Sequence, residues 1–140
     1  MLTVTPNFHF DGQCRQAIAL YENAFNAEVK TLMCYSDANP QDWKDKNDDI
    51  KDCVYHAEIM IGNQRIMLSD NVGHDLSKGN SLSLVITFET VDNVKAAYGI
   101  ISEGATIIYP ICNTTYSSCM VSLIDKFGMR WELMTEQTER

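Results

Sequence analysis

The 140-residue chain has no apolar run close to the roughly 20 residues that a membrane-spanning helix needs. Its start, MLTVTPNFHF, lacks the basic stretch, apolar stretch and cleavage site of a secretory signal. Positive charge is also scarce, because 11 Lys and Arg face 19 Asp and Glu and leave a net charge of −8. Nucleic-acid binding relies on cations that neutralise phosphates, so the composition argues against that class of partner. We expect a cytoplasmic protein that binds neither membranes nor nucleic acid.

Several catalytic signatures are missing. The sequence has no G-x-S-x-G elbow for a serine nucleophile and no G-x-G-x-x-G after a predicted strand. It also has no C-x-x-C pair, and its odd number of cysteines is scattered: Cys14, Cys34, Cys53, Cys112 and Cys119. We therefore expect reduced, mostly buried thiols rather than a disulfide framework, a zinc site or a cysteine nucleophile.

What the chain does contain is the patterning of one globular domain, with 45% hydrophobic and 21% charged residues. Residues 3–10 alternate as a strand does, and Asp11-Gly12 ends that run. Apolar residues at helical spacing predict a helix over 16–25, with Asn26 as its left-handed C-cap. The other predicted elements of this half are strands over 28–35, 54–61 and 64–69.

After a linker over 70–80 the same order of elements returns. The predicted elements are a strand over 81–88, a helix over 91–102, a strand over 105–109, a loop over 110–117, and a hairpin of 119–124 and 129–134. An internal duplication of a β-α-β-β-β unit follows. We predict a single α+β domain over 1–140, made of two repeats at about 1–73 and 80–140. Each repeat covers one sheet face with a helix, and the two free faces curve into a shared cleft, a common location for a ligand site.

The most polar segment is 36–52, SDANPQDWKDKNDDIKD, which is long for a connection inside a compact domain. It is either a solvated loop or a lid or dimer flap anchored by Trp43.

Three stretches carry a resemblance to a known family: FHFDGQCRQAIALYENAFNAEV, YHAEIMIGNQRIMLSD and DKFGMRWEL. Together with the duplication, they resemble the vicinal oxygen chelate superfamily of glyoxalases, bleomycin-resistance proteins and dioxygenases. Within it they are most similar to the PhnB-like branch, also described as 3-demethylubiquinone-9 3-methyltransferase-like. The resemblance implies a curved mixed sheet with helices outside, a ligand cleft and a homodimer. No nucleotide-binding loop supports the methyltransferase description.

Metal-using members of the superfamily hold a cation by up to four side chains, from the first and last strand of each half. By this resemblance Glu132 matches the last-strand ligand of the second half, and its counterpart in the first half is Met67. The first-strand positions fall near Thr5 and Ser83. Met, Thr and Ser are not usual ligands for a hard divalent ion, so we expect a degenerate site and no resident metal. If a divalent ion binds, Glu132 is its ligand.

Alternation along the last strand puts Arg130, Glu132 and Met134 on one face and Trp131 and Leu133 on the other. If Glu132 and Met67 face the cleft, His56, Glu58 and Met60 share that side, unless the register slips by one residue. The candidate catalytic residues are Glu132 and His56. The candidate ligand-binding residues are Met67, Tyr116, His9, Glu58 and Met60.

Each candidate also has a purely structural interpretation. His56 is either a general base or ligand contact, or a hydrogen-bonded core histidine. Glu132 is either a cleft carboxylate that exchanges a proton or pairs with a cation, or an exposed strand residue.

We predict a small-molecule-binding protein with a degenerate metal site, and leave open whether it acts catalytically on a small metabolite. Two alternatives stay open. One is a metal-dependent lyase or dioxygenase-type enzyme with an ion at Glu132 and His56 or His9 recruited to it. The other is a drug-sequestering protein like those of bleomycin resistance, in which an acidic cleft holds a basic antibiotic.

Overall fold

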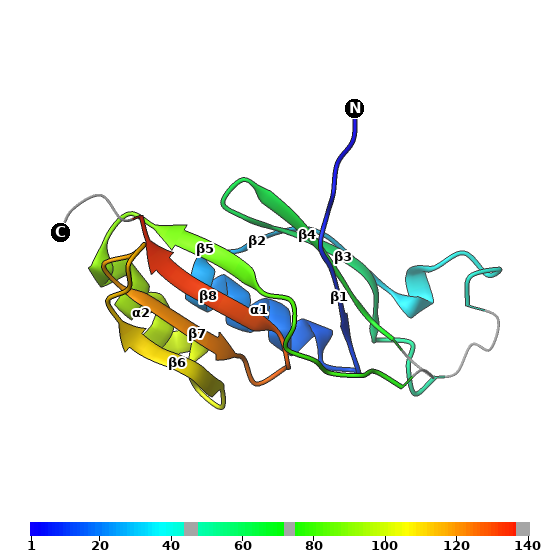
Figure 1. Ribbon diagram of the computed structural model, residues 1–140. Helices are drawn as coiled ribbons and strands as arrows, with labels where there is room; N and C mark the ends of the chain where they lie inside the picture. Colours follow the sequence, from blue (N-terminus) through cyan, green and yellow to red (C-terminus); the bar gives the residue numbers. More distant parts are fainter. Residues whose placement is uncertain (44–47, 72–74, 137–140) are drawn as a thin grey trace. The chain divides into compact units, whose positions relative to one another are not determined.

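A computed structural model describes residues 1–43, 48–71 and 75–136 of the chain (Figure 1). The chain divides into two compact units, Met1–Ser77 and Lys78–Arg140.

The first unit contains one helix and a four-stranded mixed sheet. Its elements are β1 (Asn7–Phe10), α1 (Cys14–Phe25), β2 (Glu28–Cys34), the short 3-10 helix η1 (Tyr35–Asp37), β3 (Val54–Ile61) and β4 (Gln64–Asp70). The strand order is β1-β4-β3-β2, and β1 runs parallel to β4 while the other neighbours are antiparallel.

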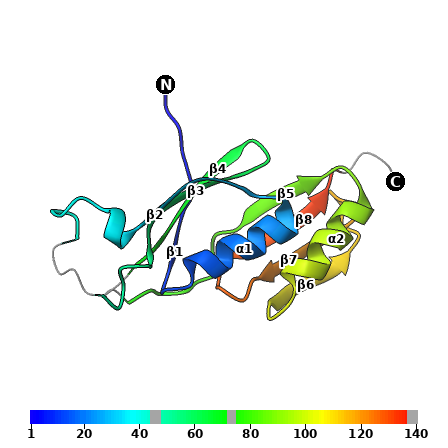
Figure 2. The same cartoon turned by 180° about the vertical axis from the view of Figure 1, so that it is seen from behind.

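The second unit repeats this plan. Its elements are β5 (Leu84–Phe88), α2 (Val91–Ile101), β6 (Thr106–Cys112), β7 (Met120–Ile124) and β8 (Arg130–Thr135). The order β5-β8-β7-β6, with β5 parallel to β8, matches the first sheet strand for strand. Figure 2 shows α2 lying against the sheet of its own unit. The predicted α+β fold of two β-α-β-β-β modules is confirmed.

In the first unit, α1 buries its apolar stripe against one face of the sheet. Tyr21 is fully buried and meets the ring of Phe8 edge-on, with centroids 6.2 Å apart. The sheet supplies Ile59, Ile66 and Leu68, none more than 1% exposed. A large apolar side chain buried in this way contributes about 1.5–3 kcal/mol, so these contacts fix which sheet face is covered.

The two helices begin in different ways. Thr90 caps α2 in the usual manner, because its hydroxyl accepts from the backbone N–H of Asn93 at 3.1 Å. Gln13, at the same place before α1, makes no such bond. Instead the buried carboxylate of Asp70, at the end of β4, accepts from the backbone N–H of Cys14 at 3.0 Å. It also accepts from the N–H of Val54 at 2.9 Å, so one side chain joins the helix start to two strands.

The hairpin of β7 and β8 turns over residues 125–128, as the sequence predicts. The Asp125 carboxylate accepts from the backbone N–H groups of Phe127 and Met129 at 2.8 and 3.1 Å. Its second oxygen accepts from the indole N–H of Trp131 at 2.8 Å. Gly128 has a φ of +96°, which other residues adopt only with strain.

Three predicted boundaries are wrong by three residues or more. β6 continues through Pro110 to Cys112, where we expected a loop over 110–117. It lies at the edge of its sheet, where a missing backbone N–H is tolerated. β1 starts only at Asn7 and β5 only at Leu84, since pairing with β4 and β8 begins there.

The prediction of mostly buried thiols is also wrong. Cys14 and Cys119 are buried, Cys34 and Cys53 are half-buried, and Cys112 is exposed. All five are free thiols.

None of the described helices is both long and apolar enough to cross a membrane.

Candidate functional site

The face of the first sheet opposite the buried Ala57 and Ile59 carries most of the candidate residues of this unit. In the register of β3 and β4, Glu58 lies opposite Met67 and Met60 lies opposite Arg65. His56, Glu58, Met60 and Met67 therefore share one face, as the alternation predicts, and all four are partly exposed. We call this the open face of the first sheet.

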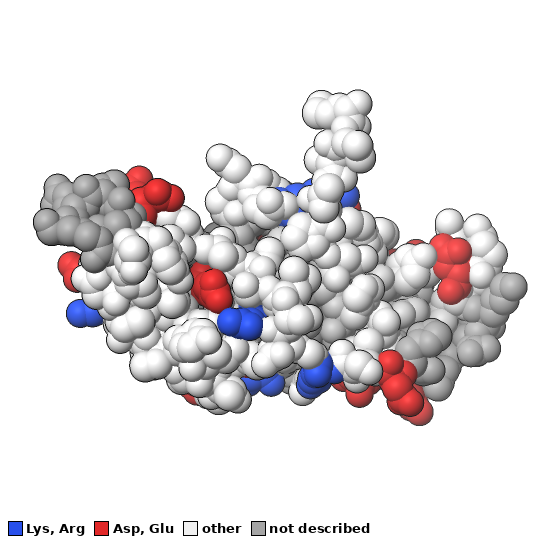
Figure 3. All heavy atoms as spheres, viewed as in Figure 1, with Lys and Arg blue, Asp and Glu red and all other residues white. Residues whose placement is uncertain are grey.

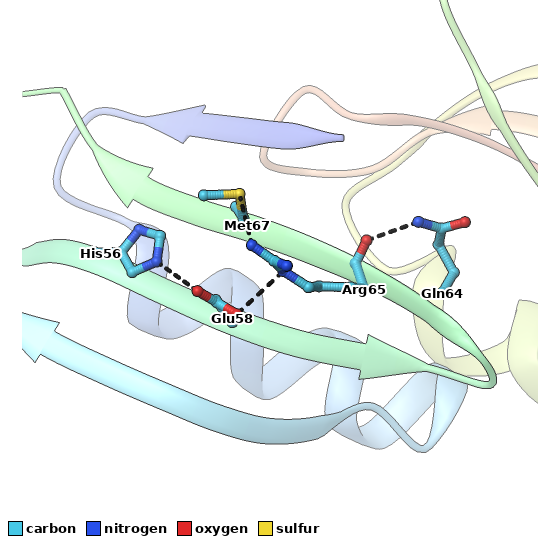
Figure 4. Close-up of polar contacts among 5 residues, drawn as sticks. All are labelled: His56, Glu58, Gln64, Arg65 and Met67. Carbon is cyan, nitrogen blue, oxygen red and sulfur yellow. Dashed lines mark hydrogen bonds and ion pairs between the residues drawn. The ribbon is translucent and has the colours of Figure 1, made fainter. Parts of the chain in front are cut away.

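Glu58 is the centre of a charged cluster on this face (Figure 4). Its carboxylate lies 2.8 Å from His56 Nε2 and 3.1 Å from Arg65 Nε. Arg65 Nη2 lies 3.6 Å from the sulfur of Met67. The hydrogen bond from His56 lowers the pKa of Glu58, and the charge of Arg65 adds to this against an opposing effect of desolvation.

The bond to Glu58 leaves the other ring nitrogen of His56 available. When neutral His56 donates from Nε2, its Nδ1 is an acceptor, and the structure gives it no partner among the described residues. An acceptor nitrogen of this kind can take a proton or a hydrogen bond from a ligand.

His9 belongs to the same open face, because it lies beside Ser69 in the pairing of β1 and β4. Its Nδ1 is 2.9 Å from the side-chain oxygen of Asn71. His9 is therefore already paired at the strand end.

The second sheet also has an open face, where Glu132 lies opposite Ser122. The hydroxyl of Ser122 donates to Glu132 Oε2 at 3.3 Å, and Arg130 Nη2 lies 3.2 Å from the same oxygen. Arg130 also donates to the Ser122 hydroxyl at 3.3 Å and to the carbonyl of Asn80 at 2.6 Å. Figure 3 shows acidic and basic atoms side by side over β8.

The cluster on the second sheet is only partly solvated. The side chains of Arg130 and Glu132 are 19% and 24% exposed, and Ser122 is fully buried. Arg130 Nε is buried and has no hydrogen-bond partner within the described part of the chain.

The two open faces correspond through the duplication. Arg65 and Arg130 occupy the same place in β4 and β8, two residues before Met67 and Glu132. The carboxylate lies on a different strand in each sheet, because Glu58 is in β3 of the first sheet and Glu132 is in β8 of the second. Sequence reasoning did not assign the arginines to the site, although their alignment between the two hairpins was the available signal.

Tyr116 lies in the connection between β6 and β7 and is 52% exposed. Its backbone N–H donates to the Thr114 hydroxyl at 3.3 Å. The structure does not place its side chain in either charged cluster.

The expected metal positions carry poor ligands. In register beside Met67 and Glu132 lie Asn7 and Val85, whereas Thr5 and Ser83 precede the strands. Within residues 1–43, 48–71 and 75–136, the structure contains no group of three or more His, Cys, Asp or Glu side chains that could hold a metal ion. The absence of a resident metal stays a prediction.

The duplicated module and its open sheet faces define a protein of the glyoxalase/bleomycin-resistance fold in the vicinal oxygen chelate superfamily. A family model described as 3-demethylubiquinone-9 3-methyltransferase matches residues 2–134. The chain belongs to this family, the PhnB-like branch of the superfamily.

Three similar proteins illustrate the family and the fold. The protein YjdN of Escherichia coli K12 is 22% identical, over 93% of this chain and 92% of its own. The PhnB protein of Bacillus cereus, which carries the same methyltransferase description, is 23% identical with a TM-score of 0.80, over 96% and 99% of the two chains. The fosfomycin resistance protein FosX of Listeria monocytogenes is 12% identical with a TM-score of 0.66, over 98% and 94%.

The connections that lead from the first strand of each unit into its helix are short. The segment Asp11-Gly12-Gln13 joins β1 to α1, and Glu89-Thr90 joins β5 to α2. Neither is a glycine-rich loop that could cradle a nucleotide phosphate.

Proposed function

We propose that the chain binds a small molecule on its open sheet faces, through the arginine–carboxylate pairs that they carry. The observation that carries this proposal is the cluster of Arg130, Glu132 and Ser122. Removing two charged groups from water costs free energy that an ion pair barely recovers, so such a pair stabilises a fold little. A charged pair kept in a largely buried place is therefore a candidate for function.

The chemistry of the two faces favours a ligand with both hydrogen-bond donors and an acidic group. Guanidinium N–H groups bind carboxylates or phosphonates, while Glu58 and Glu132 accept from hydroxyl or amino groups. The thioethers of Met60 and Met67 offer adaptable apolar contact. In this proposal His56 and Glu132 are the groups able to move a proton if the ligand reacts.

A basic antibiotic is a less suitable ligand. The drug-sequestering alternative needs acidic groups that are free to meet a cation. Glu58 and Glu132 each have an arginine partner, and this balances the charge of both clusters.

A thermal-shift screen followed by calorimetry tests the proposal. The panel should contain small carboxylates, phosphonates including fosfomycin, and basic drugs including bleomycin. For a hit, we expect Glu132→Gln or Glu58→Gln to weaken the Kd about tenfold, the equivalent of about 1.4 kcal/mol. Glu103→Gln is the matched control, because Glu103 pairs with Lys126 in an exposed ion pair outside both faces. If none of the compounds stabilises the protein, the proposal is wrong.

The metal-dependent alternative requires His56 or His9 beside Glu132. His56 is bonded to Glu58 and His9 to Asn71, each through one ring nitrogen. Elemental analysis of protein purified without chelator separates the alternatives, since stoichiometric Zn, Ni, Mn or Fe would favour the enzyme.

We also propose that the protein is a cytoplasmic homodimer, as the resemblance to the superfamily implies. Light scattering after size exclusion should give twice the chain mass of 15.8 kDa. A mass of one chain at micromolar concentration would contradict the dimer.

A further inference from the structure

An exposed tyrosine, Tyr109, lies on the open face of the second sheet. Tyr109 in β6 pairs with Ser122 in β7, and Ser122 pairs in turn with Glu132 in β8. Val85 in β5 pairs with Glu132 from the other side. The side chains of directly paired residues lie on the same face of a sheet. These four residues therefore form one row across the four strands of the sheet (Figure 1).

A bulge in β6 turns Tyr109 toward this face. Ile107 pairs with Leu123, which is fully buried on the face that α2 covers, whereas Tyr109 pairs with Ser122. Two residues of β6 thus advance over one residue of β7, so Ile107 and Tyr109 lie on opposite faces although they are two positions apart. Bulges of this kind redirect a side chain, and they are frequent next to active sites.

The first sheet has a bulge at the same place but different side chains in the corresponding row. Its bulge lies between Val29 and Thr31 of β2, and Thr31 pairs with Glu58. The row continues through Met67 to Asn7. It ends in a threonine and an asparagine, whereas the row of the second sheet ends in a tyrosine and a valine. Of the two open faces, only the second therefore has apolar side chains at both ends of this row.

The two ends of the second row are open to a ligand. Tyr109 is 55% exposed and Val85 is 52% exposed. Glu132 lies between them and is partly exposed, like its partner Arg130. Small-molecule sites are lined mostly by apolar and aromatic side chains, with a few polar groups that fix the orientation of the ligand. The row has this composition, and the ring of a tyrosine can stack on an aromatic ring of a ligand.

We propose that the second open face binds an acid that also carries a hydroxyl or amino group and an aromatic ring, and that this ring lies against Tyr109. The inference rests on the proposed function, which it narrows to one sheet and one class of ligand. Arg130 is the donor for the acidic group, Glu132 accepts from the hydroxyl or amino group, and Val85 provides apolar contact. Tyr109 is then the residue that selects aromatic acids over acids without a ring.

Three hydroxy acids of equal charge test this class of ligand. Mandelate carries a phenyl ring, hexahydromandelate carries a saturated ring in its place, and lactate carries a methyl group there. Each acid is titrated into the full-length, isotope-labelled protein, and the NMR shifts of the Ser122 and Glu132 amides report binding to this face. We expect the Kd of mandelate to be about tenfold below that of lactate and about threefold below that of hexahydromandelate.

Variants of Tyr109 test its role in this preference. Tyr109→Ala should raise the Kd of mandelate about tenfold and change that of lactate by less than about twofold, because only mandelate has a ring to lose contact. Tyr109→Phe keeps the ring and should leave both values within about twofold. Ile107→Ala is the matched control, since it removes an apolar side chain from the same strand but from the opposite face.

The inference is overturned if mandelate binds no more tightly than lactate, or if Tyr109→Ala leaves the preference for mandelate unchanged. It is also overturned if mandelate shifts Glu58 in place of Ser122 and Glu132. Failure of the proposed function gives a different result, because then no compound of the wider panel, with or without a ring, shifts the amides of either open face. If acids without a ring bind beside Glu132 and mandelate does not, only the aromatic class of ligand is wrong.

Discussion

At the scale of single residues, the charged side chains of the two clusters are only partly exposed to water and form ion pairs and hydrogen bonds with one another. Glu58 has one partner from its own strand, His56, and one from the next, Arg65. Because its pKa is lowered, the folded chain binds this proton more weakly than the unfolded chain does. Its contribution to stability is complete above the ordinary pKa of 4.5 and is lost as the pH falls through the lowered value.

Removing His56 should undo most of this shift. Carbon-detected NMR titration should place the Glu58 midpoint below 4.5 in the native chain, and His56→Ala should move it upward, since the hydrogen bond from His56 is the larger cause. His9→Ala is the control, because His9 is bonded to Asn71 and should leave the midpoint in place. An unchanged midpoint in His56→Ala would assign the shift to Arg65 instead.

The buried carboxylate of Asp70 should contribute to stability through the two backbone N–H groups that it accepts from. Asn at position 70 keeps one acceptor but turns an N–H₂ group toward one of two buried backbone donors, Cys14 or Val54. We expect Asp70→Asn to lower the free energy of unfolding by about 1–3 kcal/mol in urea titration. The exposed Asp75→Asn should stay within about 0.5 kcal/mol. Equal effects of the two changes would mean that the buried bonds contribute nothing.

At the scale of elements, different residues supply the hydrogen-bond acceptor at the start of each helix, Thr90 for α2 and Asp70 for α1. One substitution before each helix tests this difference. Thr90→Ala removes the cap of α2 and should destabilise the protein by about 1 kcal/mol. Gln13→Ala, at the equivalent place before α1, should change stability by less than about 0.5 kcal/mol, because Asp70 supplies the acceptor there. Chemical denaturation of both variants measures this, and a larger loss in Gln13→Ala would reverse the assignment.

The elements also mark how far the sequence could predict the fold. Local signals sufficed where neighbours decide the conformation, as at Asn26, whose φ is +57°, and at the turn before Gly128. They failed at Pro110, since only the strand order tells that β6 is an edge strand. The hydrogen bond by which Asp70 anchors α1 joins residues 56 positions apart in the chain. Hydrophobic periodicity does not predict a contact at that separation.

The same distinction holds for the candidate site. Strand alternation predicted which residues share the face of His56 and Glu58, because side chains alternate whatever the tertiary context. It could not predict that Arg65 and Arg130 pair with the carboxylates. The shared cleft expected between the two halves stays a prediction.

At the scale of the whole molecule, the duplication explains what was kept and what diverged. Both units keep the strand order and the arginine of the last strand. They differ in the strand that carries the carboxylate, which is β3 in the first unit and β8 in the second. They also differ at the last-strand position where metal-using relatives would need a ligand, which is Met67 in the first unit and Glu132 in the second.

This divergence leads to a prediction about divalent ions. A site occupied at 100 times its Kd adds about 2.7 kcal/mol to the free energy of unfolding, which would raise Tm by roughly 5 °C or more in a chain of this size. With Met67, Asn7 and Val85 at three of the four positions, we expect Zn, Ni, Mn or Fe(II) to leave Tm within about 1 °C of its value in chelator. Glu132→Gln separates the possible outcomes. A rise in Tm that this variant abolishes would restore the metal-dependent enzyme, whereas a rise that survives it would place the ion elsewhere on the chain.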